Sequence, residues 1–269
     1  MILNEKVILL TGGSSGIGYK CALAYAQEGA RIALISNNTE DIDTVITELG
    51  NNGHIGIHCD VSNEEDVKRS LEKTIQHYGR LDAIHNNAGI VTPSKVLHET
   101  SLEEWQLLMD INLKSVFLTT KYGFKALKET RGSILNTSSL SAQIGQQDHA
   151  AYSATKGGIN TLTKSMALDY AQYGIRVNAV CPAWVWTPAV QQWMDTQSDK
   201  EEAQTYIKNV HPLGYCPGGD VVADVCVFLL SEKSRFITGC TLPVSGGAEL
   251  GYRSISSIRT VGKVDEKGV

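Results

Sequence analysis

The stretch Val7-Ile8-Leu9-Leu10-Thr11-Gly12-Gly13-Ser14-Ser15-Gly16-Ile17-Gly18 decides the fold of this 269-residue chain. It places a short apolar run directly before a glycine-rich turn, and a helical pattern follows from Tyr19 to Glu28. Glycines let the main chain approach a pyrophosphate closely, and the N-terminus of the helix stabilises its charge. The spacing T-G-x-x-x-G-x-G after a strand therefore predicts a dinucleotide-binding loop, with a glycine-rich turn that binds nothing as the plainer alternative.

Similar apolar runs recur down the chain, each followed by a longer stretch with helical spacing. This alternation is typical of βα units and a parallel sheet covered by helices on both faces. We find no internal repeat and no linker that would divide the chain, so we expect a single domain over residues 1–269. The seven predicted strands are Val7–Thr11, Arg31–Ser36, His54–Cys59, Leu81–His85, Ser133–Thr137, Arg176–Cys181 and Thr241–Val244.

Other local patterns predict helix starts, a lid and a tail. Ser62 with Glu65, and Ser101 with Glu104, fit the S-x-x-E capping box of a helix N-terminus. Residues 183–218 break the βα rhythm with three prolines and three tryptophans, which indicates an insertion that covers a ligand site. The polar, basic tail at residues 249–269 is expected either to fray or to dock on a neighbouring subunit.

Composition excludes several classes of protein. The chain is 42% hydrophobic and 20% charged, with a net charge of -5, which rules out disorder and argues against a nucleic-acid partner. No apolar run approaches the roughly 20 residues that span a bilayer, so we expect a cytoplasmic protein without a membrane contact. The six cysteines form no C-x-x-C pair, so we expect reduced, mostly buried thiols and no metal.

The end of the second predicted strand addresses the choice between NAD and NADP. An acidic side chain usually binds the ribose hydroxyls about 20 residues beyond the glycine loop, whereas a basic one binds the 2′-phosphate. This chain has Ser36, Asn37 and Asn38 there, and its loop holds no Arg or Lys. The pattern favours NAD, with Ser36 and Asn37 bonded to the ribose, and leaves NADP possible. Asp60 is either an adenine ligand or a simple turn residue.

A catalytic site is indicated by Tyr152 and Lys156, which lie four residues apart at the start of a predicted helix. That spacing puts both side chains on one face, where an ammonium ion can lower the pKa of a phenol. A Tyr/Lys pair at this spacing is common by chance, but Ser139 and the Asn86–Gly89 stretch follow predicted strands as well. All three features should meet at the carboxyl edge of the sheet, where open parallel sheets bind ligands.

Taken together, the motifs resemble the short-chain dehydrogenase/reductase family over essentially the whole chain. The matching positions are Thr11–Gly18, Asp60, Asn86–Gly89, Asn112, Ser139, Tyr152, Lys156 and Pro182–Thr187. The resemblance implies an α/β fold: a Rossmann-type, doubly wound domain with a seven-stranded parallel sheet between two layers of helices. It also implies catalytic roles for Asn112, Ser139, Tyr152 and Lys156.

In these roles Tyr152 exchanges a proton with the substrate, Ser139 orients the reacting oxygen, and Lys156 binds the nicotinamide ribose and lowers the phenol pKa. Asn112 lies inside a helical pattern, so we expect a local break there that holds a water molecule; an ordinary helix-surface position is the alternative. Ala183 stands where the family usually has glycine. The implied cofactor-binding residues are Gly12, Ser14, Ser15, Gly16, Ile17, Gly18, Ser36, Asn37, Asp60, Val61, Asn87, Ala88, Gly89, Tyr152, Lys156, Pro182, Val185 and Thr187.

Three further stretches, 144–146, 186–188 and 245–252, are similar to a branch of the family that oxidises sugars or other cyclic alcohols with NAD as a homotetramer. The expected substrate is an L-fucose-like sugar, a polyol or another cyclic alcohol. A hydroxysteroid dehydrogenase, a ketone reductase and a catalytically silent NAD sensor are the alternatives. We expect Ser139, Gln146, Tyr152 and Trp186 to contact substrate, with Asp148, His149 and Trp193 as weaker candidates and His85 as a structural histidine.

Overall fold

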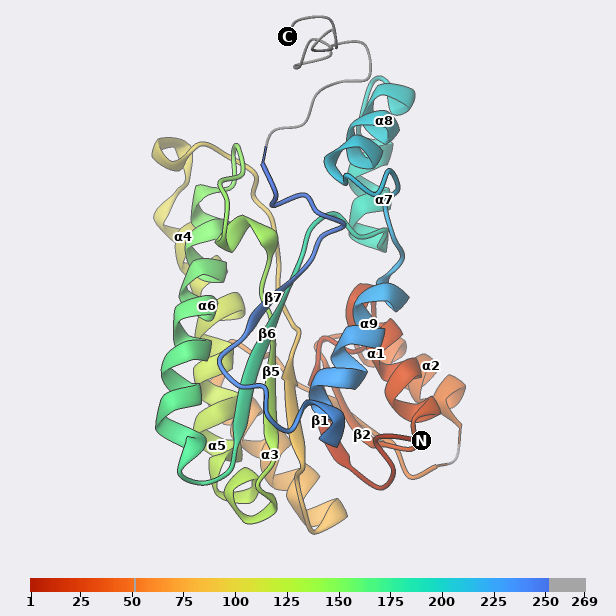
Figure 1. Cartoon of the computed structure of the whole chain (residues 1–269), viewed down its shortest axis with the longest axis vertical. Coiled ribbons are helices and arrows are strands. Elements are labelled where there is room, and N and C mark those ends of the chain that lie inside the picture. The colour runs from red at the N-terminus through yellow and green to blue at the C-terminus, as the bar shows by residue number, and fades with distance from the viewer. Residues whose placement is uncertain (51, 252–269) are drawn as a thin grey trace, which may run out of the picture.

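The computed structural model describes residues 1–50 and 52–251 and is built around one parallel sheet (Figure 1). Its seven strands run in the order β3-β2-β1-β4-β5-β6-β7, so the expected fold class is confirmed. Chain order reverses between β1 and β4, the kind of position at which such sheets bind ligands. The strands are β1 (Val7–Thr11), β2 (Arg31–Ser36), β3 (Ile55–His58), β4 (Ala83–Asn86), β5 (Ser133–Thr137), β6 (Arg176–Pro182) and β7 (Thr241–Val244).

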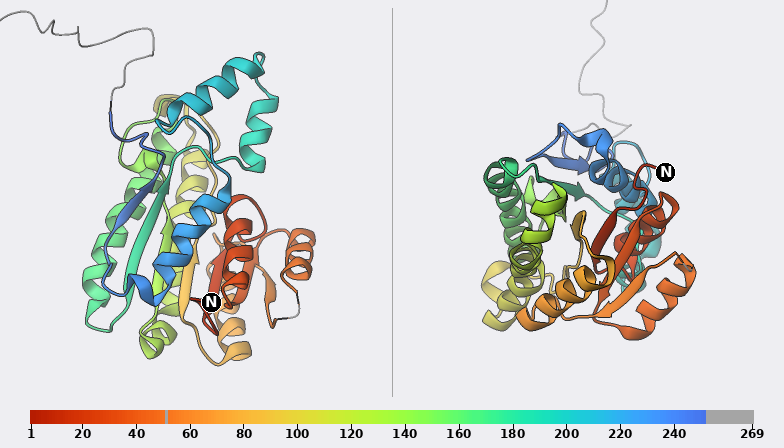
Figure 2. Two further views of the ribbon diagram at one scale, coloured as in Figure 1. Left: turned by 45° about the vertical axis from the view of Figure 1, so that its right-hand side comes forward. Right: turned by 90° about the horizontal axis from the view of Figure 1, so that it is seen from below.

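Helices cover both faces of the sheet, as the view from below shows (Figure 2). Strand β1 shows why, because Ile8 and Leu10 enter the core beside α1, α2 and α9, whereas Val7 and Leu9 enter the core beside α3, α5 and α6. A strand that is apolar on both faces needs such a layer on each side. The α-helices are α1 (Gly16–Gln27), α2 (Thr39–Leu49), α3 (Glu64–Tyr78), α4 (Leu102–Leu108), α5 (Ser115–Thr130), α6 (Ala150–Ala171), α7 (Pro188–Asp195), α8 (Lys200–Val210) and α9 (Gly219–Leu230).

One of the two predicted capping boxes is confirmed and the other is wrong. At α4 the Ser101 side chain accepts from the Glu104 backbone N–H, and the Glu104 carboxylate accepts from the Ser101 N–H. At α3 the cap is Asn63. Ser62 instead donates its hydroxyl to Asp60 Oδ1 at 2.7 Å, because the carboxylate two residues earlier is the stronger acceptor.

The predicted irregularity around Asn112 is a π-helix, Met109–Lys114, inserted between α4 and α5. Such wide turns arise where a side chain or an extra residue interrupts the α-helical ladder, and they are frequent at functional sites. This one turns the Asn112 side chain into the protein, where the residue is 1% exposed. The alternative of an ordinary helix-surface position is therefore wrong.

Helices α7 and α8 rise above the carboxyl edge of the sheet (Figures 1 and 2). They pack on one another through a small cluster that contains Met194, Ala203 and Ile207, with Trp184 and Trp193 against it. The start and the end of this segment are joined by a hydrogen bond, in which the Trp186 backbone N–H donates to the Pro217 carbonyl at 2.8 Å. Of the tail at 249–269, only residues 249–251 are described.

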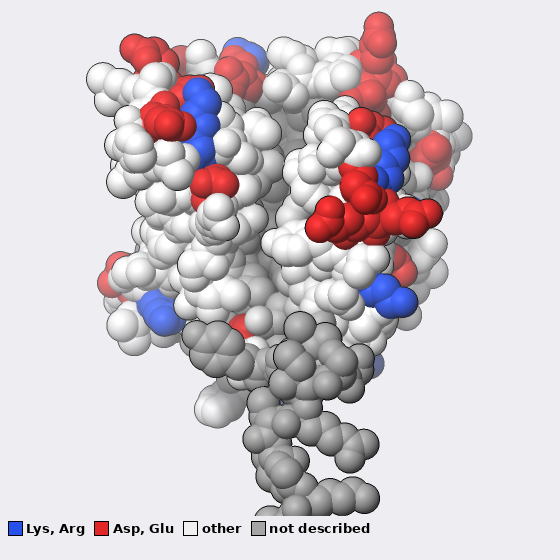
Figure 3. Space-filling model, turned by 90° about the horizontal axis from the view of Figure 1, so that it is seen from above, with Lys and Arg blue, Asp and Glu red and all other residues white. Residues whose placement is uncertain are grey.

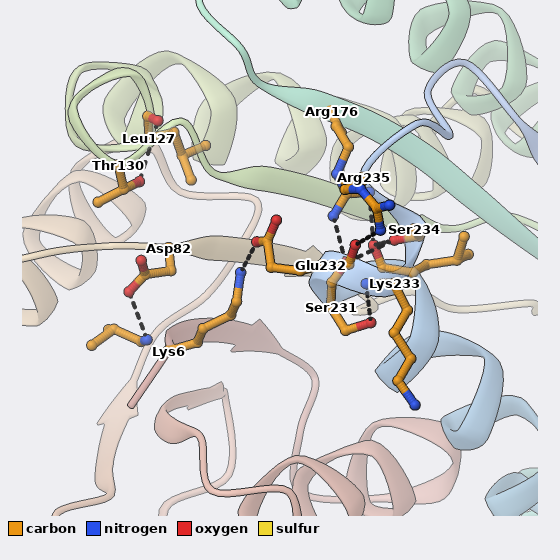
Figure 4. Close-up of polar contacts among 12 residues, drawn as sticks. Lys6, Asp82, Leu127, Thr130, Arg176, Ser231, Glu232, Lys233, Ser234 and Arg235 are labelled. Atoms are coloured by element: carbon orange, nitrogen blue, oxygen red, sulfur yellow. Dashed lines mark hydrogen bonds and ion pairs between the residues drawn. The ribbon is translucent and has the colours of Figure 1, made fainter. Parts of the chain in front are cut away.

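The opposite, amino edge of the sheet is held by polar contacts around a cavity of about 210 Å³ (Figure 4). Lys6 binds Glu232 at 2.7 Å, and Arg176 donates to the backbone carbonyls of Leu229 and Ser231. These contacts fasten the end of α9 to β1 and β6. Within the described part of the chain, none of the helices is long and apolar enough to cross a membrane.

Candidate active site

The glycine loop after β1 packs directly against the segment after β4. Gly12 has a φ of 62°, and a Cβ there would lie 2.8 Å from the Ala88 Cα, so only glycine fits. The Thr11 hydroxyl accepts from the N–H groups of Asn87 and Ala88, each at 3.0 Å. Asn87 Nδ2 donates to the Gly12 carbonyl at 3.0 Å. Two of the predicted cofactor segments are thus joined into one rigid edge.

The N-terminus of α1 suits an anionic group. Its cap residue, Ser15, is extended and makes no side-chain capping bond, and the first turn holds no acidic residue. The amide groups of such a turn lack intrahelical partners, and together with the helix dipole they favour a pyrophosphate. Thr187 lies over this turn, because a Cβ at Gly16 would come within 3.5 Å of the Thr187 methyl. Nicotinamide dinucleotides fit this surface.

The predicted ribose position lies beside the loop. Ser36 Oγ is 2.8 Å from Ser14 Oγ and also accepts from the Asn38 N–H. Asn37 is exposed, whereas Asn38 caps α2. The first turn of α2 carries Glu40 and Asp41, so this end of the groove is acidic.

Farther along the edge, Asp60 Oδ1 accepts from both the N–H and the hydroxyl of Ser62, which makes Asp60 a turn residue. The adenine contact of Asp60 stays a prediction. Val61 beside it is buried.

Tyr152 and Ser139 meet at the carboxyl edge, where α6 begins and β5 has just ended. The Ser139 hydroxyl accepts from the Ser141 N–H and hydroxyl at 3.2 and 3.0 Å, which fixes its position. A hydrogen bond with Ser139 lowers the pKa of the Tyr152 phenol, but burial raises that pKa more strongly. In this structure burial therefore favours the neutral form of the phenol.

Lys156 does not yet lower the pKa of Tyr152 as the sequence led us to expect. Its ammonium donates to the Thr137 carbonyl at 2.8 Å and lies 5.7 Å from the centroid of the Tyr152 ring. Burial lowers the pKa of Lys156 from 10.5 to about 8, because a charged ammonium is poorly solvated there. The carbonyl partner, which sequence reasoning missed, satisfies the ammonium in the absence of a ligand.

Asn112 closes the far side of this site. Its Oδ1 accepts from the Ile90 N–H at 2.8 Å, and its Nδ2 donates to the Ile90 carbonyl at 2.9 Å and to Thr155 Oγ1 at 3.1 Å. A Cβ at Gly89 would lie 3.2 Å from Asn112 Oδ1 and 3.4 Å from Lys156 Nζ. The structure thus gathers the Asn112 amide and the Lys156 ammonium around Gly89. The water that we expect beside Asn112 stays a prediction.

The residues that we predict to contact substrate are more widely spread than the four predicted catalytic residues. Trp186 is 40% exposed and lines a cavity of about 380 Å³ with Ser14, Gly16 and Tyr19, on the side of the glycine loop. Trp193 packs against Trp184 within the lid, with the ring centroids 5.0 Å apart and the ring planes tilted by 49°. These two indole rings are thus engaged away from Tyr152, and no sequence pattern indicates which way a lid side chain points.

Nearer to Tyr152, His149 lies 6.2 Å away, ring centroid to ring centroid. Its Nε2 is bonded to Ser94, and its Nδ1 is bonded to the Gln147 carbonyl. Gln146 is exposed and Asp148 is half-buried. Pro182 and Val185 are buried beneath the lid.

Seen from above, the molecule is hollowed between its two sides, and the hollow has largely uncharged walls (Figure 3). Acidic side chains lie on the outer parts of both sides, with a large group on the right in this view. A hollow of this kind suits an uncharged organic substrate better than a polyanion.

Comparison with known proteins bears out the resemblance inferred from the motifs. A family model described as enoyl-(acyl carrier protein) reductase matches residues 12–249. L-Fucose dehydrogenase of Bos taurus is 38% identical over 250 residues, which is 92% of this chain and 90% of that protein.

Two solved structures extend the comparison. The ligand-free aldohexose dehydrogenase of Thermoplasma acidophilum has a TM-score of 0.85 and 32% identity, covering 94% of this chain and 98% of that one. The 3-ketoacyl-(acyl-carrier-protein) reductase of Brucella melitensis, complexed with NADH, has a TM-score of 0.84 and 29% identity, covering 91% of this chain and 99% of that one.

Proposed function

The chain belongs to the short-chain dehydrogenase/reductase family, and we propose that it oxidises a secondary alcohol of an L-fucose-like sugar or a related cyclic substrate with NAD. It is an NAD(P)-dependent oxidoreductase that acts on CH–OH donors. Its substrates are small molecules.

One observation carries the assignment of roles. Tyr152 lies in contact with Ser139 at the carboxyl edge, while Lys156 and Asn112 close on Gly89 next to the glycine loop. A proton-transfer group, an orienting hydroxyl and a cation thus share one crevice with a dinucleotide-binding turn. We infer that this crevice performs the chemistry.

The chain's own residues divide the work of alcohol oxidation. When bound, the nicotinamide cofactor supplies the hydride acceptor, or the donor for ketone reduction. Tyr152 Oη takes the proton of the substrate hydroxyl while the C–H bond of the carbon that bears this hydroxyl breaks. Ser139 Oγ donates a hydrogen bond to the hydroxyl oxygen. Lys156 is charged below about pH 8. We propose that in the cofactor-bound site its ammonium lowers the pKa of the Tyr152 phenol by Coulomb attraction, an effect that the structure described here does not show. Asn112 holds Ile90 and the floor of the site in place.

The preference for NAD rests on charge. A 2′-phosphate carries close to two negative charges, and Ser36, Asn37 and the glycine loop offer no cation to neutralise them. The acidic first turn of α2 adds repulsion. Ser36 and Ser14, 2.8 Å apart, suit uncharged ribose hydroxyls.

Two exposed apolar faces support a homotetramer. Helices α4 and α5 expose Leu107 and Phe117, while Leu168 of α6 and Phe236, just before the edge strand β7, are 81% and 101% exposed. Two separate self-complementary faces generate two twofold axes, which is the arrangement of a tetramer with dihedral symmetry.

The decisive experiment compares wild type with Tyr152→Phe on L-fucose, aldohexoses, cyclic diols, hydroxysteroids and a 3-ketoacyl thioester, each with NAD and with NADP. We expect NAD-dependent oxidation of a sugar, and a fall in kcat of about 10³-fold or more in Tyr152→Phe with unchanged Kd for NAD. Retained turnover would overturn the role of Tyr152. Cofactor binding with no turnover on any substrate would favour the NAD-sensor alternative, and reduction of the thioester alone would favour the ketone reductase.

A further inference from the structure

Three metal-binding side chains meet in the core, although they lie far apart in the sequence. Cys21 of α1, Cys226 of α9 and His85 of β4 place their sulfur and ring-nitrogen atoms within 4.8 Å of one another. All three residues are 0% exposed. No sequence motif indicates this site, because metal motifs are recognised by short spacings such as C-x-x-C, whereas here the packing of α1 on α9 over β4 brings the three residues together.

The histidine is oriented as metal ligands are. His85 Nε2 lies 2.9 Å from Thr137 Oγ1 on β5, which leaves Nδ1 to face the helices. Tyr25 Oη is 2.9 Å from that Nδ1, and Tyr25 follows Cys21 by one helical turn on α1. In metal sites the imidazole nitrogen that does not bind the metal is usually hydrogen-bonded to a neighbouring polar group, as His85 Nε2 is to Thr137, and this bond fixes the ring.

We propose that Cys21, Cys226 and His85 bind a thiophilic divalent cation, zinc, with Tyr25 Oη beside the fourth position. Zinc prefers four ligands in a tetrahedron, with metal–sulfur and metal–nitrogen distances of about 2.3 and 2.0 Å, so its ligand atoms lie about 3.5–3.8 Å apart. The present separations, all within 4.8 Å, need a contraction of at most about 1.3 Å, which side-chain rotation supplies.

The charges also balance. Two thiolates neutralise a divalent cation, so the loaded site carries no net charge into the fully buried core. Metal binding therefore displaces the protons of both thiols.

The site lies beneath the cofactor loop and is linked to it. Thr137 Oγ1 is in hydrogen-bond contact with Asn87 Oδ1 at 3.3 Å, and Asn87 Nδ2 donates to the Gly12 carbonyl. A metal ion here therefore joins α1, β4 and α9 where the glycine loop is anchored. Its expected effect is on the stability of this half of the molecule, independent of the substrate.

The test measures zinc directly. The full chain is produced in zinc-supplemented medium under reducing conditions, passed through a weak chelator and analysed for metal by plasma mass spectrometry. We expect about one zinc per chain in wild type, and a loss of about tenfold or more in Cys21→Ser and, separately, in Cys226→Ser. The matched control is Cys59→Ser, since Cys59 is equally buried but outside the cluster.

A second measurement does not depend on the variants folding. Wild type refolded with Co²⁺ should show thiolate-to-cobalt charge-transfer absorption, and zinc should raise its melting temperature above that of protein refolded with chelator. Wild type that holds no zinc, gives no such absorption and melts at the same temperature with and without metal overturns the proposal. A mass two hydrogens lower under the same conditions also overturns it, because the two sulfurs would then form a disulfide.

Discussion

A buried charge at Lys156 serves the site at the expense of the fold. The residue is 3% exposed, and its ammonium has the Thr137 carbonyl as its hydrogen-bond partner. The fall in pKa from 10.5 to about 8 corresponds to about 3 kcal/mol of destabilisation when the amine is charged. Lys156, for which we propose a catalytic role, thus reduces the stability of the folded protein.

Lys156→Met should therefore abolish turnover and stabilise the protein. At pH 7 we expect the free energy of unfolding to rise by about 1–2 kcal/mol, since the lost hydrogen bond to Thr137 offsets part of the relief. The destabilisation of wild type is fully present below about pH 8 and is relieved as pH approaches 10.5, because only the unfolded chain still binds the proton there. The gain should shrink over this interval.

Urea denaturation at several pH values measures this difference. Lys164→Met, on the exposed side of the same helix, is the matched control and should change stability by less than about 0.5 kcal/mol. A less stable Lys156→Met protein at pH 7 would show that the hydrogen bond outweighs the cost of burial.

The π-helix Met109–Lys114 turns a single asparagine into a brace between two segments. Without the wide turn, the carboxamide of Asn112 would not reach the Ile90 backbone on one side and Thr155 on the other. Both Ile90 groups depend on it for hydrogen bonds. The element therefore positions the loop after β4, which includes Gly89.

Asn112→Ala should weaken both the fold and the reaction. We expect a loss of about 2–3 kcal/mol in the free energy of unfolding, because the half-buried Ile90 backbone groups and Thr155 lose their partner, and a fall in kcat of about 10- to 100-fold. Thr155→Val removes a single bond and keeps those to Ile90, so its loss should be near 1 kcal/mol. Equal losses in the two variants, measured by denaturation and steady-state kinetics, would contradict the bracing role of Ile90.

Elements were predictable where local chemistry decides them. The apolar runs place every strand within two residues of its observed ends. The Ser101 box forms although Lys95 also binds the Glu104 carboxylate, because Lys95 contacts one carboxylate oxygen and the Ser101 N–H contacts the other. The Ser62 box failed since Asp60 lies within reach. The direction of side chains within the lid was not predictable from sequence: Trp186, which we predict to contact substrate, lines the cavity beside the glycine loop.

At the scale of the whole molecule, contacts between distant segments escape sequence reasoning. The Thr137 carbonyl that holds Lys156 and the meeting of Cys21 with Cys226 both arise from packing of elements remote in the chain. The motifs nevertheless gave the edge at which the catalytic groups converge, because parallel strands end on one side of a sheet.

The exposed apolar side chains also predict how copies of this chain associate. Phe117 of α5 is 54% exposed and Phe236 is fully exposed. The segment that follows Phe236 runs along α6, since a Cβ at Gly239 would lie 3.5 Å from Ala167 of that helix. Side chains of this size rarely stay in water in groups. If each face joins one pair of copies, Phe117→Arg and Phe236→Arg should each leave dimers, and the double variant should be monomeric.

Light scattering coupled to gel filtration measures these masses. Thr47→Arg, which adds the same charge to the exposed side of α2, should leave the tetramer intact. A wild-type monomer would refute the proposed assembly outright. A tetramer that survives the double variant would place its contacts elsewhere. The dimers of the two single variants should be held by different faces. Each variant can pair only through the face that does not carry the new arginine.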